Sequence, residues 1–223
     1  MKEKKPKVVF MENVKNFVSH DNGNALNVVK GTMEELGYTF NYKVLSAADY
    51  GILQKRERVY IVCFRSDLSV TGFTYPEPVR LTRHVEDFLL DDESKTKNLY
   101  VVRPDIQINN TDNTYSNKTI RLGIVNKGCQ GERIYSTKGV AITLSAYGGG
   151  AFAKTGGYLI DGKVRRLHPR ECARITGYPD SYKLSENNNQ AYKQLGNSVV
   201  IDVLQYIAIE IGKTLKNNEN FLR

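Results

Sequence analysis

The sequence contains no tryptophan and only three cysteines in 223 residues. Cys63, Cys129 and Cys172 are widely spaced and form no Cys-x-x-Cys pair, so neither a metal site nor a disulfide framework is expected. An odd number of cysteines without a signal peptide indicates a reduced, cytoplasmic protein. No apolar run is long enough to span a bilayer, so no membrane association is expected.

The composition is that of a globular chain with a basic surface. Apolar residues make up 40% of the sequence, which suffices for a core in one or two domains. The formal net charge is +8 and the pI is about 9.3, which favours an acidic partner, with nucleic acid as the first candidate. A soluble cationic domain without such a partner would have the same composition.

Residues 8–14 begin with apolar side chains that lead directly to Glu12 and Asn13. This pattern predicts a short buried strand whose carboxyl end presents a carboxylate. In open α/β sheets that edge is where ligands bind. A plain strand followed by a capping pair fits the same residues.

The next segments predict a layered α/β body. Residues 24–36 carry an apolar face that includes Leu26 and Met33, and Gly37 is expected to end the helix. Residues 40–44 alternate and residues 59–64 are continuously apolar, which is typical of strands. The order strand, helix, strand, loop, strand indicates half of an α/β sheet.

A cationic segment precedes the last of these strands. In an extended chain Arg56 and Arg58 project to the same side, which suits phosphate or a carbonyl acceptor. Taken alone, these two residues are better explained by a solvated strand edge that uses charge against aggregation.

From residue 100 to about residue 167 the chain is rich in Thr, Asn, Gly and Tyr, which predicts a small, turn-rich β domain. It contains two glycine-rich loops, residues 127–133 and residues 143–150. Glycine allows close backbone approach to a ligand, and Gln and Arg can contact base edges in DNA. Flexible hairpin tips would have a similar composition.

The C-terminal part returns to helices. Pro169 is suited to a first helical position, with Cys172 facing inward and Gly177 as the stop. Ser185 is expected to cap a further helix. An apolar stripe over residues 199–215 then predicts a long helix that packs back on the sheet.

Five of these segments, taken in order, closely resemble the cytosine-5 DNA methyltransferases, in particular bacterial members that methylate GCGC. The resemblance covers the chain almost end to end and rests on the following residues: Glu12-Asn13-Val14, residues 54–58, the two glycine-rich loops, residues 170–174 with 177–180, and residues 194–199. One short match could be chance, but five in the family's order are specific.

The resemblance implies the architecture. The expected fold is α/β, part of a doubly wound S-adenosylmethionine-dependent methyltransferase sheet with an inserted small β-rich target-recognition domain. Residues 1–86 would form a partial catalytic domain and residues 87–168 the target-recognition domain. Residues 169–196 would be a hinge, and residues 197–223 a helix returning to the catalytic domain.

The resemblance also implies a chemistry. In this family a cysteine thiolate attacks C6 of a cytosine flipped out of the duplex, and C5 then takes the methyl group of S-adenosylmethionine. Glu12 would act as a general acid at N3 of the cytosine. Arg58 would hold the cytosine O2 and help bind phosphate, and Arg56 would support the phosphate contact.

Further roles are carried over to the two glycine-rich loops. Gln130 matches the residue that fills the space left by the flipped base, and Arg133 matches a guanine reader. Thr143 matches a DNA-backbone contact. Tyr147 and Gly150 match positions near the bases.

Asn197 and Ser198 match a segment that contacts S-adenosylmethionine. Two positions depart from the family pattern: Leu53 replaces the usual proline before Gln54, and Cys129 replaces a glycine. The second change adds a thiol to a loop that reorganises around DNA, which puts its ease of insertion in doubt.

Two family motifs do not occur in these residues: the glycine-rich Phe-x-Gly-x-Gly and the nucleophilic Pro-Cys-Gln. We therefore expect a C-terminal two-thirds of such an enzyme, with an incomplete cofactor site. Alone it is expected to be inactive and unstable or aggregation-prone. Its expected partners are double-stranded DNA and an N-terminal subunit that carries the catalytic cysteine, within a restriction-modification system. The alternatives are an inactive truncated remnant and a sequence-specific DNA-binding module without catalysis.

Overall fold

The chain passes back and forth between two units in the computed structural model, which describes residues 1–79, 82–111 and 114–219. The first unit comprises the described residues of Met1–Ser46, Glu57–Pro78 and Val203–Arg223. The second comprises those of Ala47–Arg56 and Val79–Asp202. This grouping does not test the predicted boundaries of a recognition domain or a hinge, which stay predictions.

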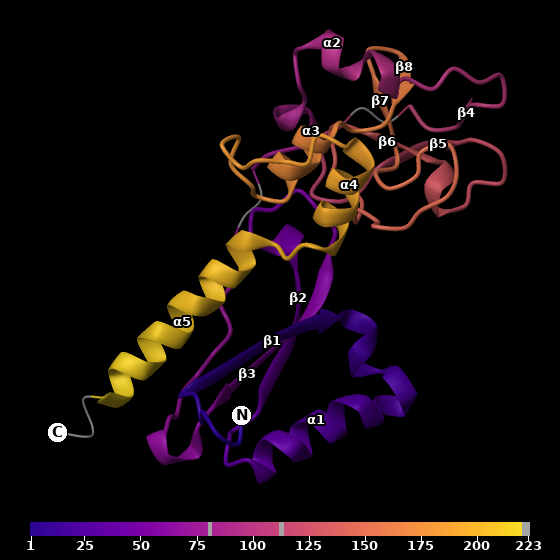
Figure 1. The fold of residues 1–223 in the computed structure, drawn as a ribbon. Helices are drawn as coiled ribbons and strands as arrows, with labels where there is room; N and C mark the ends of the chain where they lie inside the picture. The colour runs from indigo at the N-terminus through magenta and orange to yellow at the C-terminus, as the bar shows by residue number, and fades with distance from the viewer. Residues whose placement is uncertain (80–81, 112–113, 220–223) are drawn as a thin grey trace. The chain divides into compact units, whose positions relative to one another are not determined.

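A three-stranded sheet forms the centre of the first unit (Figure 1). Its strands are β1 (Val8–Val14), β2 (Asn41–Ser46) and β3 (Glu57–Phe64), in the order β1-β3-β2. Both pairings are antiparallel. As the middle strand, β3 is buried from Val59 to Phe64, so both of its faces are covered. Its continuous apolar run is typical of that position.

The prediction for residues 8–14 was right about the strand but wrong about its burial and about the place of Glu12. Within the described residues β1 pairs only with β3, so it is an edge strand, with Phe10 38% and Val14 50% exposed. Glu12 lies inside β1, opposite Tyr60, rather than beyond its end. The α/β class is confirmed. That these strands belong to a larger doubly wound sheet stays a prediction.

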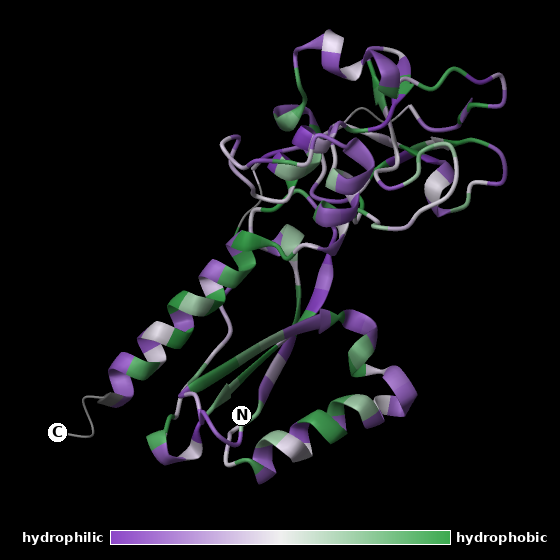
Figure 2. Ribbon diagram, viewed as in Figure 1, coloured by the Kyte–Doolittle hydropathy of each residue, from purple (hydrophilic) through white to green (hydrophobic). Residues whose placement is uncertain are grey.

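Helices α1 (Asn24–Glu35) and α5 (Ile201–Glu219) lie on opposite sides of this sheet (Figure 1). Hydrophobic and hydrophilic residues alternate along both helices (Figure 2), as one-sided packing requires. In α1, Leu26 and Met33 are buried against side chains of β3. Gly23, at φ +87°, precedes the helix, and Gly37, at φ +80°, follows it as predicted.

The apolar stripe predicted for the last helix is confirmed in α5, where Val203 and Ile207 are fully buried. The expectation that no stretch could span a membrane needs correction. By length and composition residues 188–218 pass that test, with 22% of the most apolar window buried. Residues 198–200 are not helical and divide this stretch, and core helices of soluble proteins pass the same test.

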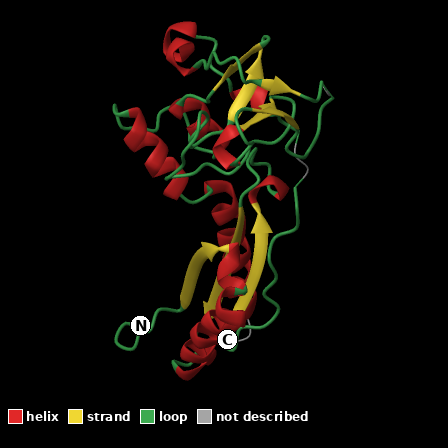
Figure 3. Ribbon diagram, turned by 90° about the vertical axis from the view of Figure 1, so that its right-hand side faces the viewer, coloured by secondary structure: helices red, strands yellow, loops and turns green. Residues whose placement is uncertain are grey.

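The second unit contains a five-stranded sheet with long loops between its strands (Figure 3). In spatial and sequence order the strands are β4 (Gln107–Ile108), β5 (Arg121–Ile124), β6 (Arg133–Ser136), β7 (Gly157–Ile160) and β8 (Lys163–Arg165). Within this sheet, as far as the structure describes it, β6 and β7 pair in parallel and the other neighbouring strands pair antiparallel. A turn-rich β region was predicted here and is confirmed; its role in target recognition is taken up below.

The described part of the second unit also contains the helices α2 (Glu93–Thr96), α3 (Pro169–Ile175) and α4 (Asn188–Asn197). Cys172 faces inward from α3, as predicted, and is fully buried. The cap of α4 is Asn187 rather than Ser185, since the Asn187 Oδ1 accepts hydrogen bonds from Asn189 and Gln190 at 2.9 and 3.2 Å. An amide that reaches two backbone N–H groups is an effective cap. Short 3-10 turns complete the chain: Lys15–Val18, His20–Gly23, Ala47–Asp49, Ser66–Leu68, Val85–Phe88, Lys97–Leu99 and Gln130–Glu132.

A buried ion pair joins β8 to α3. Arg165 donates to Glu171 through two nitrogens at 2.7 and 2.8 Å, and the side chains are 3% and 0% exposed. Glu171 also accepts from the backbone N–H groups of Leu90 and His168. The carboxylate is therefore fully hydrogen-bonded, which is what a buried charge requires.

Candidate functional site

Glu12 and Arg58 meet on one face of the three-stranded sheet. Arg58 pairs with Val14 across the β1–β3 ladder, and Glu12 pairs with Tyr60, so the two charged side chains are diagonal neighbours. The Nε of Arg58 lies 3.1 Å from the Glu12 Oε1, and the two side chains are 16% and 22% exposed. A carboxylate and a guanidinium are thus held together by strand register while both remain accessible to a ligand.

Arg56 is buried in the second unit. Its Nη1 donates to the Gly196 carbonyl at 3.2 Å and its Nη2 to the Ser198 carbonyl at 2.5 Å, and the residue is 4% exposed. These contacts fix the turn between α4 and α5. Arg56 therefore has a structural role that the sequence did not indicate, and the predicted phosphate contact stays a prediction.

The loop of residues 127–133 is closed by its own polar groups. The Oε2 of Glu132 accepts from the backbone N–H of Cys129 at 3.0 Å, and the Nε of Arg133 donates to the Gly128 carbonyl at 3.0 Å. Gln130 begins the short 3-10 turn Gln130–Glu132 and is exposed at the tip. The two side chains of this loop that were predicted to contact bases, Gln130 and Arg133, therefore lie at the beginning and just after the end of this turn.

A polar network supports the base of this loop. Asn126 donates to Glu132 at 2.9 Å and accepts from Arg103 at 2.8 Å, and Arg103 also forms a two-nitrogen contact with Asp105. The hydrogen bonds from Asn126 and from the Cys129 backbone lower the pKa of Glu132. The carboxylate is thereby kept charged as the fixed acceptor of the loop.

The loop of residues 143–150 is attached to the segment that precedes β3. The hydroxyl of Thr143 donates to the Lys55 carbonyl, and the Lys55 N–H donates to the Ala141 carbonyl at 2.9 Å. Tyr147 is 75% exposed, with the ammonium of Lys193 5.3 Å from its ring centre. An exposed aromatic ring beside a cation suits stacking on a nucleobase and contact with a phosphate.

The two glycine-rich loops line a common pocket of about 350 Å³. Predicted site residues from both loops contribute to it: Gln130, Thr143, Tyr147 and Gly150. Arg133 does not line it. Lys154 also lines the pocket and was missed by the sequence analysis, although its place just after the glycine run was a signal that could have indicated it.

Asn197 and Ser198 lie where α4 ends. Asn197 is exposed, whereas the Ser198 hydroxyl donates to the Leu195 carbonyl at 2.8 Å. These two residues offer hydrogen-bonding groups at a single turn and cannot by themselves enclose a nucleoside cofactor. At this turn they could hold one edge of S-adenosylmethionine.

Two of the three cysteines are buried and one is exposed. Burial raises the pKa of the Cys63 thiol to about 12 and that of Cys172 well above its ordinary value, so both remain protonated. Cys129 is exposed in the loop of residues 127–133. Among the described residues no group of three or more His, Cys, Asp or Glu side chains is placed so that it could hold a metal ion.

Comparison with known proteins places this arrangement in a family. The chain is 64% identical to the Type II methyltransferase M.HhaI of Haemophilus parahaemolyticus over 216 residues, which cover 96% of the chain and 66% of that protein. It is 35% identical to the Type II methyltransferase M.SsoII of Shigella sonnei over 96% of the chain and 55% of that protein. The chain thus spans less than two thirds of the length of these relatives.

Solved structures agree in fold. A putative DNA modification methyltransferase encoded within a prophage in E. coli matches 96% of this chain and 71% of its own, with a TM-score of 0.66 and 17% identity. At that identity the likeness shows the fold alone. A model of the C-5 cytosine-specific DNA methylases matches residues 1–213, nearly the whole sequence. The chain therefore belongs to the C-5 cytosine-specific DNA methylase family, as its motifs predicted.

Proposed function

We propose that this chain supplies the acid–arginine pair and the DNA-contacting loops of a cytosine-5 DNA methyltransferase of a restriction-modification system. The nucleophilic cysteine and most of the cofactor pocket would come from polypeptide outside these 223 residues. The substrate would be a short site in double-stranded DNA, such as GCGC, in the cytoplasm.

The contact between Glu12 and Arg58 carries the proposal. Attack of a thiolate on C6 of cytosine moves electron density toward N3, so a carboxylic acid at N3 lowers the barrier by supplying a proton. Arg58 would donate to the cytosine O2 from beside the carboxyl group. The 3.1 Å contact and partial exposure of the pair support these roles, because both groups can face one pyrimidine edge.

The loops of the second unit would contact the DNA. Gln130 would enter the space left by the flipped cytosine, Arg133 would donate to a guanine edge, and Tyr147 and Gly150 would lie near the bases. Thr143 would contact the DNA backbone. The net charge of +8 supports attraction to DNA. In this proposal residues 87–168 form the target-recognition domain, residues 169–196 the hinge and residues 197–223 the returning helix.

S-adenosylmethionine would supply the methyl group when bound. Asn197 would hydrogen-bond to it from the exposed end of α4, while Arg56 would hold the neighbouring backbone in place and support phosphate binding. In this proposal the rest of the cofactor pocket and the thiolate would come from residues outside these 223.

The outer edge of β1 supports completion by another polypeptide segment. Among the described strands only β3 pairs with β1, which leaves unpaired N–H and C=O groups and an exposed Phe10 on an edge strand. Such an edge is a template for a further strand and a liability when uncovered. A segment bearing Pro-Cys-Gln would cover it and bring the cysteine into the same sheet.

The test is complementation. The chain is co-expressed with a polypeptide that carries the Phe-x-Gly-x-Gly and Pro-Cys-Gln motifs, and the plasmid is challenged with a nuclease that cuts unmethylated GCGC. Protection only when both polypeptides are present supports the proposal. Protection by the chain alone contradicts the assigned origin of the cysteine. Cutting of every plasmid, with both proteins soluble and associated, contradicts the function.

A DNA-binding module without catalysis is the second candidate, favoured by loops that share a pocket within a single unit and by the buried, protonated state of two cysteines. It predicts GCGC-specific binding by the chain, with no methylation on complementation. If the chain is an inactive remnant, we expect neither GCGC-specific binding nor methylation.

A further inference from the structure

The loops of residues 127–133 and 143–150 touch through their backbones, with glycine on both sides. A Cβ built on Gly131 would lie 1.9 Å from the Gly149 carbonyl oxygen and 3.0 Å from its carbonyl carbon. A Cβ on Gly150 would lie 2.6 Å from the Gly131 carbonyl oxygen. Because the opposing atoms belong to the backbone, no side-chain rotation could relieve either overlap.

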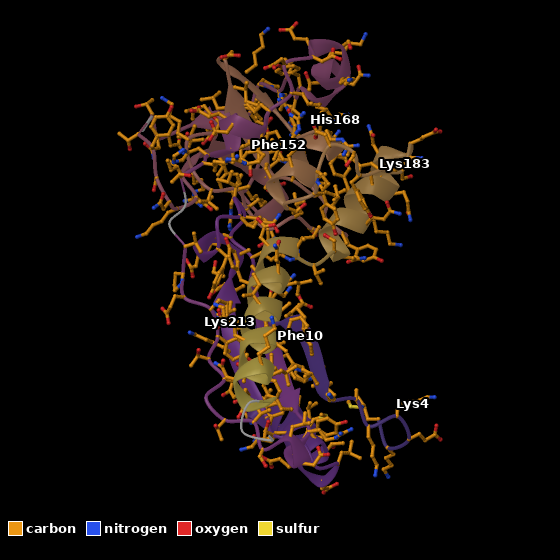
Figure 4. The ribbon with its side chains drawn as sticks, turned by 90° about the vertical axis from the view of Figure 1, so that its left-hand side faces the viewer. Lys4, Phe10, Phe152, His168, Lys183 and Lys213 are labelled. Carbon is orange, nitrogen blue, oxygen red and sulfur yellow. The ribbon has the colours of Figure 1, made fainter. Side chains whose placement is uncertain are left out.

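A hydrogen bond closes this glycine contact. The backbone N–H of Phe152 donates to the Gly131 carbonyl at 2.8 Å, just beyond the second loop. Phe152 is fully buried and lies among the side chains of the second unit (Figure 4). Its ring lies against Gly157 of β7, where an added Cβ would approach the ring to 2.8 Å. The first loop is thus bonded to a residue fixed in the core.

We propose that Gly131 is a positioning residue that holds the two glycine-rich loops together as one preformed DNA-contacting surface. The bearing on DNA rests on the function proposed above, whereas the contact between the loops does not. The contact between Gly131 and Gly150 would set the positions of the DNA-contacting side chains in both loops. These side chains are Gln130 and Arg133 in the first loop and Tyr147 in the second.

The physical consequence is a lower cost of binding. If the loops were separate, each would have to be ordered on the DNA, and that ordering would be subtracted from the affinity. The glycine contact fixes the distance between Gln130, which would enter the DNA duplex, and Tyr147, which would lie near the target cytosine. Loss of the contact should weaken DNA binding while leaving the chemistry of bound DNA unchanged.

The structural test compares Gly131, which has no space for a Cβ, with Gly149, which has. Gly131→Ala places a Cβ against backbone, whereas Gly149→Ala places one where no atom lies within 4 Å. Amide hydrogen exchange of Phe152 is measured in the full chain with its complementing polypeptide, without DNA. We expect the protection of this amide to fall by about ten-fold or more in Gly131→Ala and to stay unchanged in Gly149→Ala. Equal protection in wild type and Gly131→Ala overturns the inference.

The functional test separates positioning from a loss of folding. In the complemented enzyme, Gly131→Ala should raise the KM for DNA about ten-fold while kcat at saturating DNA is kept. Gly31→Ala, in α1 with no atom within 4 Å of the new Cβ, serves as the control for both constants. A fall in kcat at unchanged KM, or no change in either constant, overturns the positioning role.

Failure of the proposed function has a different signature. If the wild-type complemented enzyme methylates no DNA, the proposed function fails, and the exchange of Phe152 alone then decides whether Gly131 joins the loops. Loss of protection restricted to Gly131→Ala supports the inference in that case, and equal loss in Gly149→Ala overturns it.

Discussion

Arg56 and Gly196 are separated by 140 residues in the sequence, yet the Arg56 Nη1 donates to the Gly196 carbonyl at 3.2 Å. A Cβ on Gly196 would lie 2.5 Å from the Ala146 backbone nitrogen. The segment before β3 thus holds the end of α4, which in turn packs on the loop of residues 143–150. A buried guanidinium at this junction joins three distant parts of the chain.

Replacement of this guanidinium tests its structural role. Arg56→Lys leaves an ammonium that cannot reach both the Gly196 and the Ser198 carbonyls in the same planar geometry. We expect the free energy of unfolding to fall by about 1–3 kcal/mol, measured by urea denaturation. Lys55→Ala, at the exposed neighbouring side chain, should change it by less than about 0.5 kcal/mol. Equal effects of the two changes would contradict this role.

Glu12→Gln tests the acid in the complemented enzyme. The amide keeps the shape of the side chain but cannot supply a carboxylic proton, so kcat should fall by about 10²-fold or more with little change in the Kd for DNA. Single-turnover methylation and DNA binding are measured in parallel. Glu57→Gln, which removes the exposed carboxylate that pairs with Lys15 at 2.8 Å, serves as the control. Equal turnover of wild type and Glu12→Gln would argue against a general acid.

Arg133→Ala should relax site selection, because it removes a donor that can pair with guanine. The expected loss of discrimination is about 1–3 kcal/mol at one base pair, measured with duplexes substituted one position at a time. Arg121→Ala, on the exposed side of the adjacent strand β5, should weaken binding to all duplexes evenly if it has any effect. An unchanged preference in Arg133→Ala would exclude guanine reading.

The partial burial of His168 should make the free energy of unfolding depend on pH. Its Nδ1 accepts from the Arg170 N–H at 3.1 Å at the start of α3, and burial lowers its pKa, with further effects from neighbouring charges. The neutral imidazole is therefore favoured in the folded state. The stability it contributes is present above the unfolded pKa of about 6.5 and is lost as the pH falls below that value. His168→Asn keeps a capping acceptor that does not titrate, so its urea midpoint should fall less on acidification. Parallel pH profiles of the two proteins would refute this assignment.

Glu171→Gln should be the most destabilising of these changes. It leaves the buried Arg165 without a counter-charge, which typically costs about 3–5 kcal/mol. Thermal or urea unfolding measures this loss. Asp180→Asn, which breaks the exposed pair with Arg174, is the matched control and should have little effect. A small effect of Glu171→Gln would mean that water reaches the Arg165 guanidinium.

The local elements follow closely from the residue pattern. Residues 59–64 are apolar throughout and form the central strand β3, while the spacing of Leu26 and Met33 matches a helix buried on one side. Glu12 was predicted at the carboxyl end of the first strand and lies within it, because the extent of a strand depends on its pairing with a partner. Ser185 was predicted as a cap, but several polar residues there could serve, and the folded turn selects Asn187.

The sequence likewise predicted only part of the candidate site. The motif order led to the family, and the comparisons confirm that family. The burial of Arg56 could not be predicted, because a run of cations usually faces solvent, and its carbonyl acceptors lie 140 and 142 residues further along the chain. The contact of Gly131 with Gly150 could not be predicted either, since glycine has no side chain whose type could indicate a neighbour.

The sequence by itself determined the central strand β3, the helices α1, α3 and α5 and the methylase family, because periodicity and ordered motifs are properties of residues near one another in the chain. Only the tertiary structure decided that β1 is an edge strand, that Glu12 meets Arg58 across a ladder, and that two glycine-rich loops share one contact. These relationships depend on register and on close backbone approach between distant segments. Both are set by packing of the whole fold.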